Sequence, residues 1–209
     1  LEPGETIRWH RPAVIADGSE FVITDDRGNI YRVAAKGTPQ PFLTQVAGNR
    51  LDVLIDSGLA AVHDTVYGIS RSSGSDVILA IEPGDLKVAD EFDLQGARVT
   101  WGPEHVGDAV LFVTDNDKLH SYGVGQKARW KEPGAAYGKP AGLPLVSDND
   151  LIFAAYNGAV WRISAATGQE VQKTDLGQPL GAGPVAFGTR LLLGGNDGSL
   201  HVITMPTGS

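Results

Sequence analysis

Apolar and polar positions along the chain follow a short pattern that recurs five times. Each copy reads turn residue, any residue, aliphatic, large ring or aliphatic, any residue, apolar. The copies occupy residues 28–33, 76–81, 117–122, 158–163 and 198–203, so their spacings are 48, 41, 41 and 40 residues. A period near 40 built from short alternating segments is typical of the blades of a β-propeller.

The residues around each copy complete a blade. A run rich in β-formers precedes most copies, as at 21–24, 111–114 and 151–154, and such runs suit strands buried on both faces. Pairs such as Asn157-Gly158 supply the positive φ of a tight hairpin. A second turn follows at Gly37, Gly84, Gly125, Gly168 and Gly208, and a fourth strand follows it in the first four copies. The pattern predicts an all-β fold, a single β-propeller domain over residues 1–209 with about five four-stranded blades.

The fifth copy stops after its third strand. Residues 4–9 (Gly-Glu-Thr-Ile-Arg-Trp) have the same form as residues 125–130 (Gly-Gln-Lys-Ala-Arg-Trp), which lead into an outer strand. We therefore expect the N-terminal strand to complete the last blade and close the ring without an open sheet edge. The alternative is a fragment of a seven- or eight-bladed propeller.

Charge and composition narrow the choice of partner. The chain has 17 Lys and Arg against 25 Asp and Glu, a net charge of −8, with no basic run. Binding to nucleic acid or to an anionic membrane is not expected, because both need a basic surface. No window approaches 18 apolar residues and the N-terminus lacks a signal-peptide pattern, so we expect a soluble chain without membrane insertion. The absence of cysteine excludes disulfides and thiolate chemistry.

Two stretches carry a family resemblance. Residues 157–171 (Asn-Gly-Ala-Val-Trp through Ala-Thr-Gly-Gln-Glu-Val) and their echo at 196–208 resemble the repeat of quinoprotein-type, PQQ-like propellers. That family includes pyrroloquinoline-quinone alcohol dehydrogenases and the non-catalytic propeller lipoprotein of the outer-membrane β-barrel assembly machinery. The resemblance implies a tryptophan four residues after the Thr-Gly turn that docks one blade on the next. Gln172 holds that position in the fourth copy, while Trp9 and Trp130 lie five residues after their glycines.

Candidate catalytic groups have simpler structural interpretations. His120 and His201 share a column with Tyr31, Leu79 and Trp161, so packing between blades explains them. The acidic turns, such as Asp25-Asp26 and Asp115-Asn116-Asp117, offer oxygens to calcium but lack EF-hand spacing, and Asp and Asn favour turns for local reasons. An alcohol dehydrogenase of the family would need a cysteine pair and a longer chain. We expect no catalytic residues and no cofactor, with calcium as the weaker alternative.

Five residues remain as candidates for binding a partner, since exposed Trp, Tyr and Arg commonly anchor protein interfaces. They lie in or near the connection from the third copy to the fourth: Trp101, Tyr122, Arg129, Trp130 and Tyr137. The alternative is ordinary packing between blades.

The sequence thus predicts a non-catalytic propeller scaffold that binds protein or peptide partners, in the periplasm or elsewhere in the bacterial cell envelope or extracellular space. Two alternatives stay open. One is a quinone- or calcium-dependent enzyme or small-ligand binder of the same superfamily. The other is a carbohydrate-binding or adhesion propeller.

Overall fold

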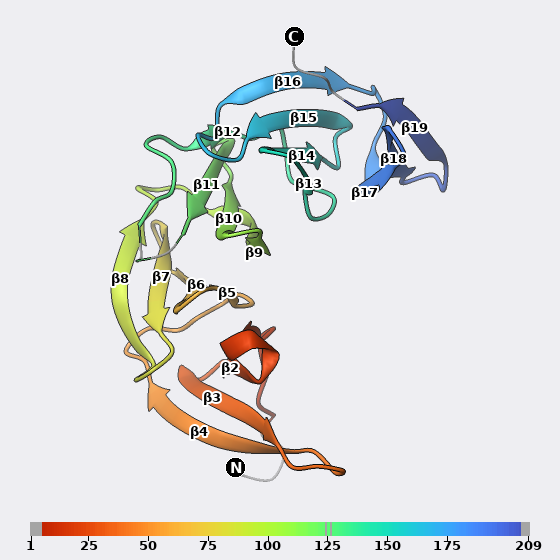
Figure 1. Cartoon of the computed structure of the whole chain (residues 1–209). Coiled ribbons are helices and arrows are strands. Elements are labelled where there is room, and N and C mark those ends of the chain that lie inside the picture. Colours follow the sequence, from red (N-terminus) through yellow and green to blue (C-terminus); the bar gives the residue numbers. More distant parts are fainter. Residues whose placement is uncertain (1–5, 124, 126, 206–209) are drawn as a thin grey trace. The chain divides into compact units, whose positions relative to one another are not determined.

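The computed structural model describes residues 6–123, 125 and 127–205. These residues form nineteen strands and one short 3₁₀ helix, η1 (Ala16–Gly18). The strands make five antiparallel sheets that follow one another along the chain, from red to blue in Figure 1. This is an all-β propeller of about five blades, as the sequence predicts. None of the described residues belongs to a helix long and apolar enough to cross a membrane.

The chain divides into two compact units, and each is described by itself. The first is Leu1–Val110 with Gly123–Lys127, and the second is Leu111–Tyr122 with Ala128–Ser209. The prediction of a single domain stays a prediction. The strands of the first unit, in sheet order, are β1 (Ala13–Ile15), β2 (Glu20–Thr24), β3 (Asn29–Lys36) and β4 (Phe42–Arg50), then β5 (Ala60–Val62), β6 (Thr65–Arg71), β7 (Asp76–Glu82) and β8 (Lys87–Asp93), followed by β9 (Val99–Val106).

The third sheet has the order β12-β11-β10-β9, and the division between the units falls within β10. The fourth has four strands and the last has three, β17-β18-β19. The remaining strands are β10 (Ala109–Thr114), β11 (Lys118–Tyr122), β12 (Gly134–Ala135), β13 (Leu145–Ser147), β14 (Asp150–Ala154), β15 (Ala159–Ser164), β16 (Glu170–Asp175), β17 (Leu180–Phe187), β18 (Arg190–Gly195) and β19 (Leu200–Thr204).

The sequence repeat is also a structural repeat. The third strand of every sheet begins within two residues of a predicted copy. In three sheets the pairing of the third and fourth strands shifts at the same column, between Arg32 and Val33, Ala80 and Ile81, and Arg162 and Ile163. A β-bulge at a fixed position bends each outer strand in the same way.

The hairpin between β2 and β3 shows how the polar turns are built. The Asp25 carboxylate accepts hydrogen bonds from the backbone N–H groups of Arg27 and Asn29, both at 2.9 Å, and from the Asn29 side chain at 2.8 Å. Gly28 has a φ of +84°, a left-handed backbone conformation that residues with a side chain rarely adopt. The acidic turn residue therefore holds its own hairpin.

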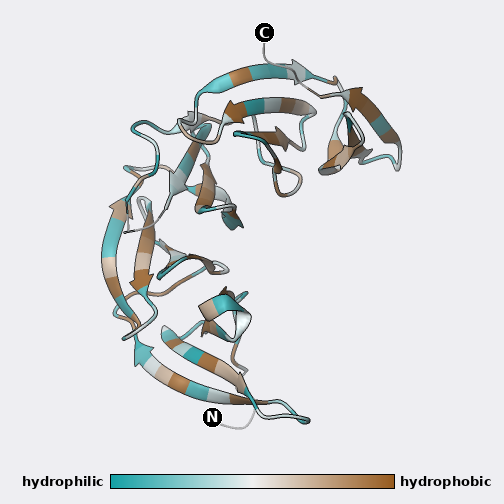
Figure 2. Ribbon diagram, in the orientation of Figure 1, coloured by the Kyte–Doolittle hydropathy of each residue, from teal (hydrophilic) through white to brown (hydrophobic). Residues whose placement is uncertain are grey.

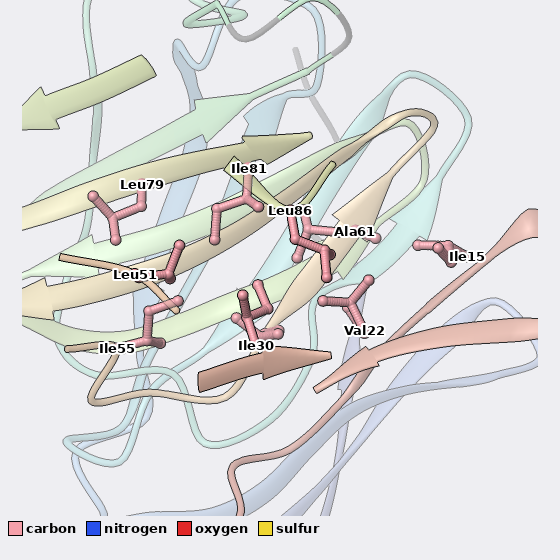
Figure 3. Close-up of a cluster of buried hydrophobic side chains, with 12 residues drawn as sticks. Ile15, Val22, Ile30, Leu51, Ile55, Ala61, Leu79, Ile81 and Leu86 are labelled. Carbon is pink, nitrogen blue, oxygen red and sulfur yellow. The ribbon is translucent and has the colours of Figure 1, made fainter. Parts of the chain in front are cut away.

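An aliphatic core joins the first and second sheets (Figure 3). Val22 and Ile30 of the first sheet lie against Ala61, Leu79 and Ile81 of the second, all in one cluster of buried side chains. In the second unit a similar cluster joins the fourth and last sheets, formed by Ile152, Ala154, Val160, Leu180, Leu191 and Leu193. The outer strands are polar by contrast. Every residue of β16 is exposed, and Figure 2 shows the strand mostly in teal.

The described part of the N-terminal segment pairs with the first sheet. The N–H of His10 donates to the carbonyl of Thr24 and the N–H of Asp26 donates to the carbonyl of Arg8, both at 3.0 Å. Residues 1–5, which include the start of the predicted closing strand, lie outside the described residues. Closure of the ring stays a prediction.

The fourth sheet repeats this entry pairing. Lys139 and Ala141 make the corresponding two backbone hydrogen bonds, on either side of Pro140. Trp9 therefore occupies the structural position of Pro140, whereas the sequence comparison matches it with Trp130. The sequence repeat and the structural repeat disagree at Trp9, because residues 8–10 run beside the hairpin between β2 and β3.

Candidate functional site

The second unit has an open hollow of about 570 Å³, which we call the Trp130 groove. One wall is the segment that leads into β12, residues 129–135. The other is the turn from β15 to β16, residues 166–170. Arg129, Lys131, Glu132 and Glu170 are exposed, so the groove carries side chains of both charges.

Trp130 joins the two walls. Its side chain is buried, and the indole Nε1 donates a hydrogen bond to the carbonyl oxygen of Ala165 at 3.0 Å. The ring lies against Gly168, where an added Cβ would come within 2.5 Å of Cε3 of the ring. Gly168 also has a φ of +74°. Trp130 thus docks the third sheet on the fourth, in the manner that the family resemblance implies.

Tyr137 lies beside the groove and is tied to one of its wall residues. Its hydroxyl donates to the carboxylate of Glu170, and Nζ of Lys173 lies 3.8 Å from the centre of its ring. The ring packs edge-on against Trp161 at 5.8 Å. The hydrogen bond to Glu170 raises the pKa of the Tyr137 hydroxyl, and desolvation adds to the effect. The connection before β13 is therefore fastened to β16.

The other candidate residues fall elsewhere. Tyr122 is buried and packs edge-on against Phe112 at 5.8 Å, and burial raises the pKa of its hydroxyl to about 12. Trp101 is half-buried in β9 of the first unit. The groove thus brings together Arg129 and Trp130, with Tyr137 adjacent. For Tyr122 and Trp130 the structure shows packing, whereas Arg129 is exposed and Trp101 and Tyr137 are half-buried.

The groove also contains residues that sequence reasoning missed. Thr167, Gln169 and Glu170 line it, and Lys173 contacts Tyr137. The Thr-Gly turn of the fourth copy is the one signal that marks this wall. Nothing in the sequence connects Lys173 with Tyr137, because only the folding of the chain brings the two residues together.

The polar side chains of the last hairpin, between β18 and β19, are tied together by hydrogen bonds. The Ser199 hydroxyl donates to Asp197 at 2.5 Å and lies 2.7 Å from Nε2 of His201, whose Nδ1 lies 3.1 Å from the Gln178 amide. A serine nucleophile needs its proton directed to the imidazole. Here the proton is directed to the carboxylate, and the Ser199 hydrogen bond lowers the pKa of Asp197.

His120 lies in the same column of the third sheet, half-buried and 3.5 Å from Oγ1 of Thr114. Burial lowers the pKa of its imidazole, and Lys118 adds to the effect. Within the part of the chain that the structure describes, no three His, Asp or Glu side chains are placed to hold a metal ion.

The first unit has a hollow of its own, about 520 Å³ in volume, with Arg32, His63 and Glu82 among its lining residues. Arg32 pairs with Glu20 and donates to the carbonyl of Pro83 at 3.3 Å. No pattern in the sequence marks this hollow, because its residues come from separate blades.

The comparison with protein families gave a match over residues 63–209, to the family described as outer membrane protein assembly factor BamB. The chain belongs to this family. The matched residues include every strand from β6 onward and both walls of the Trp130 groove. The BamB family match confirms the resemblance to PQQ-like propellers. No curated protein matches the chain.

Solved structures match the chain at low identity. BamB from Moraxella catarrhalis is 13% identical, with 95% of this chain and 71% of that one covered and a TM-score of 0.49. Two structures of BBS1N in complex with ARL6DN, soaked with mercury or lead, are 17% identical with TM-scores of 0.60. They cover 97% of this chain, which spans 66% and 63% of theirs. The BBS1N likeness supports the fold.

Proposed function

We propose that this chain is a non-catalytic scaffold that binds protein or peptide partners in the bacterial cell envelope, in the assembly of outer membrane proteins. The observation that carries the proposal is the Trp130 groove. It is open, its walls are fixed to each other, and it includes the accessible Arg129.

The geometry of the groove suits a segment of polypeptide. A volume of about 570 Å³ lies in the range of roughly 300–1,000 Å³ typical of ligand sites. The docked indole holds both walls, so a partner meets a preformed site and little ordering opposes binding. Arg129 and Lys131 favour acidic groups on the partner, while Glu132 and Glu170 favour basic ones. This function requires no cofactor.

The matching family supports the proposed location and the proposed kind of partner. The name of the matching family describes an assembly factor for outer membrane proteins, which supports an envelope location and a role among protein partners. BBS1N, a structure of similar fold, is seen in complex with ARL6DN. A propeller that presents its loops to a protein is consistent with both.

Site-specific photo-cross-linking tests the proposal. We would place benzoylphenylalanine at exposed Gln169 of the groove, in the full chain expressed in the envelope of a diderm bacterium. The matched control carries it at Glu91, exposed on the outer strand β8. We expect a discrete cross-linked product from Gln169, containing a protein engaged in outer membrane protein assembly, and none from Glu91.

A charge reversal then tests the rim. Arg129→Glu should weaken the Gln169 product several-fold, while Arg50→Glu, on the outer strand β4, should leave it unchanged. No product from Gln169, or equal products from both positions, would overturn the proposal.

A further inference from the structure

The hollow of the first unit lies where two sheets of that unit pack on each other. Its volume is about 520 Å³, and its walls include the turns from β1 to β2, from β5 to β6 and from β7 to β8. Ile15, one of its lining residues, is 7% exposed and belongs to the aliphatic cluster that joins the first and second sheets. The hollow is therefore part of an internal junction, and its size suits a small ligand or one side chain of a partner.

The charges around the hollow favour a cation. Arg32 is held across the junction, because its Nε pairs with the Glu20 carboxylate and its Nη1 donates to the carbonyl oxygen of Pro83 at 3.3 Å. Its charge is thus compensated by Glu20. The other lining residues with a formal charge are Asp64 and Glu82, and both are exposed. With His63 neutral, the hollow is left with negative charge, to which a positive group is complementary.

Thr65 adds a buried polar group to the hollow. The residue lines the hollow and is 3% exposed, and within the described part of the chain its side chain makes no hydrogen bond. A hydroxyl in such a position is unfavourable unless it gains a partner. Together with the carboxylates of Asp64 and Glu82 it provides three acceptors, which is the number of hydrogen bonds that an ammonium group donates.

His63 stands at a backbone position where two other sheets have glycine. The first two strands of four sheets are joined by the same two-residue turn: His63-Asp64, Gly107-Asp108, Asp148-Asn149 and Gly188-Thr189. The first residue of each turn has a left-handed φ, which is +48° for His63 and +61° and +59° for the two glycines. Because glycine adopts this conformation at lower cost, the imidazole is kept at a strained position, and there it lines the hollow. Strain of this kind is typical of functional sites.

We infer that the hollow of the first unit binds an aliphatic ammonium group, either the lysine side chain of a partner polypeptide or a free alkyl diamine. The two carboxylates and the Thr65 hydroxyl accept hydrogen bonds from the ammonium, while Ile15 and Pro83 offer apolar surface to its methylene stem. The lining residues of this hollow and of the Trp130 groove have no member in common, so the inference stands apart from the proposed function.

Isothermal titration calorimetry of the full chain tests the inference with three probes. Two carry the ammonium group, namely N-acetyl-lysine methylamide and cadaverine, and the third is the neutral analogue N-acetyl-norleucine methylamide. We expect saturable binding of an amine and none of the norleucine compound. Tighter binding of the lysine compound identifies a partner side chain as the ligand, whereas tighter binding of cadaverine identifies a free diamine.

Three variants locate the site. Asp64→Asn should weaken binding of the amine about tenfold, because it removes a charged acceptor. Asp108→Asn changes the same turn position in the third sheet, is not part of the hollow, and should bind as the parent does. His63→Gly should weaken binding while its stability in urea equals or exceeds that of the parent, since glycine relieves the left-handed backbone. No saturable binding of either amine, equal binding of the norleucine compound, or an Asp64→Asn variant that binds as the parent does would each overturn the inference.

Discussion

Two junctions between neighbouring sheets, one in each unit, are built in different ways. The first and second sheets are joined by an aliphatic cluster to which twelve buried residues contribute. The junction of the third and fourth sheets includes an indole ring, Trp130, which lies against Gly168 and donates a hydrogen bond to Ala165. A repeat that is regular along the chain therefore does not require a uniform contact between blades. An aliphatic junction spreads its stabilisation over many side chains, whereas an indole junction concentrates it.

Removal of the docked ring should have the largest effect. Trp130→Ala deletes a buried aromatic side chain and leaves the Ala165 carbonyl without its donor, so we expect a loss of about 3–5 kcal/mol in the free energy of unfolding. Urea denaturation measures it. Trp9→Ala is the control, since Trp9 is 51% exposed and should cost less than about 1 kcal/mol. Equal effects from the two variants would contradict the docking role.

A single deletion in the aliphatic junction should cost less. Ile30→Ala removes one of the twelve side chains, and we expect a loss of about 2–4 kcal/mol in the same assay. Leu43→Ala, at a 66% exposed position on β4, should change stability by less than about 0.5 kcal/mol. A loss from Ile30→Ala larger than that from Trp130→Ala would reverse the contrast between the two junctions.

A pair of glycine variants separates ring contact from backbone strain. Gly168 and Gly177 have φ of +74° and +69°, but an added Cβ meets Trp130 only at Gly168 and has open space at Gly177. Gly177→Ala should cost about 1 kcal/mol from its backbone alone. Gly168→Ala should cost about 1–3 kcal/mol more, because the ring must shift. Equal losses in urea denaturation would show that the ring is free to move.

The smallest expected difference between the two units is in how the free energy of unfolding responds to acid. Burial opposes ionisation of Asp25, but hydrogen bonds from Asn29 and Arg27 outweigh it, and the pKa of Asp25 lies below its ordinary value. Because the folded pKa is the lower one, its contribution to stability is present above the unfolded pKa of about 3.9 and is lost as pH falls through the folded pKa. The fourth sheet places neutral Asn157 in the matching turn.

Asp25→Asn should therefore flatten part of the acid dependence measured by urea denaturation between pH 7 and pH 2. Asn157→Ala should shift the whole curve without changing its slope. Parallel curves for the parent chain and Asp25→Asn would show that the Asp25 carboxylate is not the source of the acid dependence of stability.

The sequence predicted those parts of the molecule that periodicity controls. Ile30, Ile78, Leu119 and Val160 lie in one column and are fully buried, because alternation fixes which face a strand residue joins. The acidic turns also bond their own hairpins as expected, since Asp25 acts within four residues of itself.

The site was predicted only in part. Trp130 and Tyr122 were singled out as aromatic residues, but residue type does not tell a docked ring from an exposed one. The groove depends on contacts between segments more than 30 residues apart, such as Trp130 with Ala165 and Tyr137 with Glu170. Register between blades sets these contacts, and no local pattern encodes it. The match of Trp9 with Trp130 failed for the same reason.

The order in which the sheets are covered also has a consequence during synthesis on the ribosome. The apolar face around Val160 is shielded by Leu180, Leu191 and Leu193 of the next sheet, and that sheet belongs to a copy whose repeat begins 40 residues further along the chain. At roughly 5–20 residues per second, each new blade waits about 2–8 s before its cover has been translated. The growing polypeptide therefore always exposes one uncovered apolar face, on the blade that was synthesised last. That face moves toward the C-terminus as translation proceeds. A holdase chaperone that protects this chain would have to follow it blade by blade.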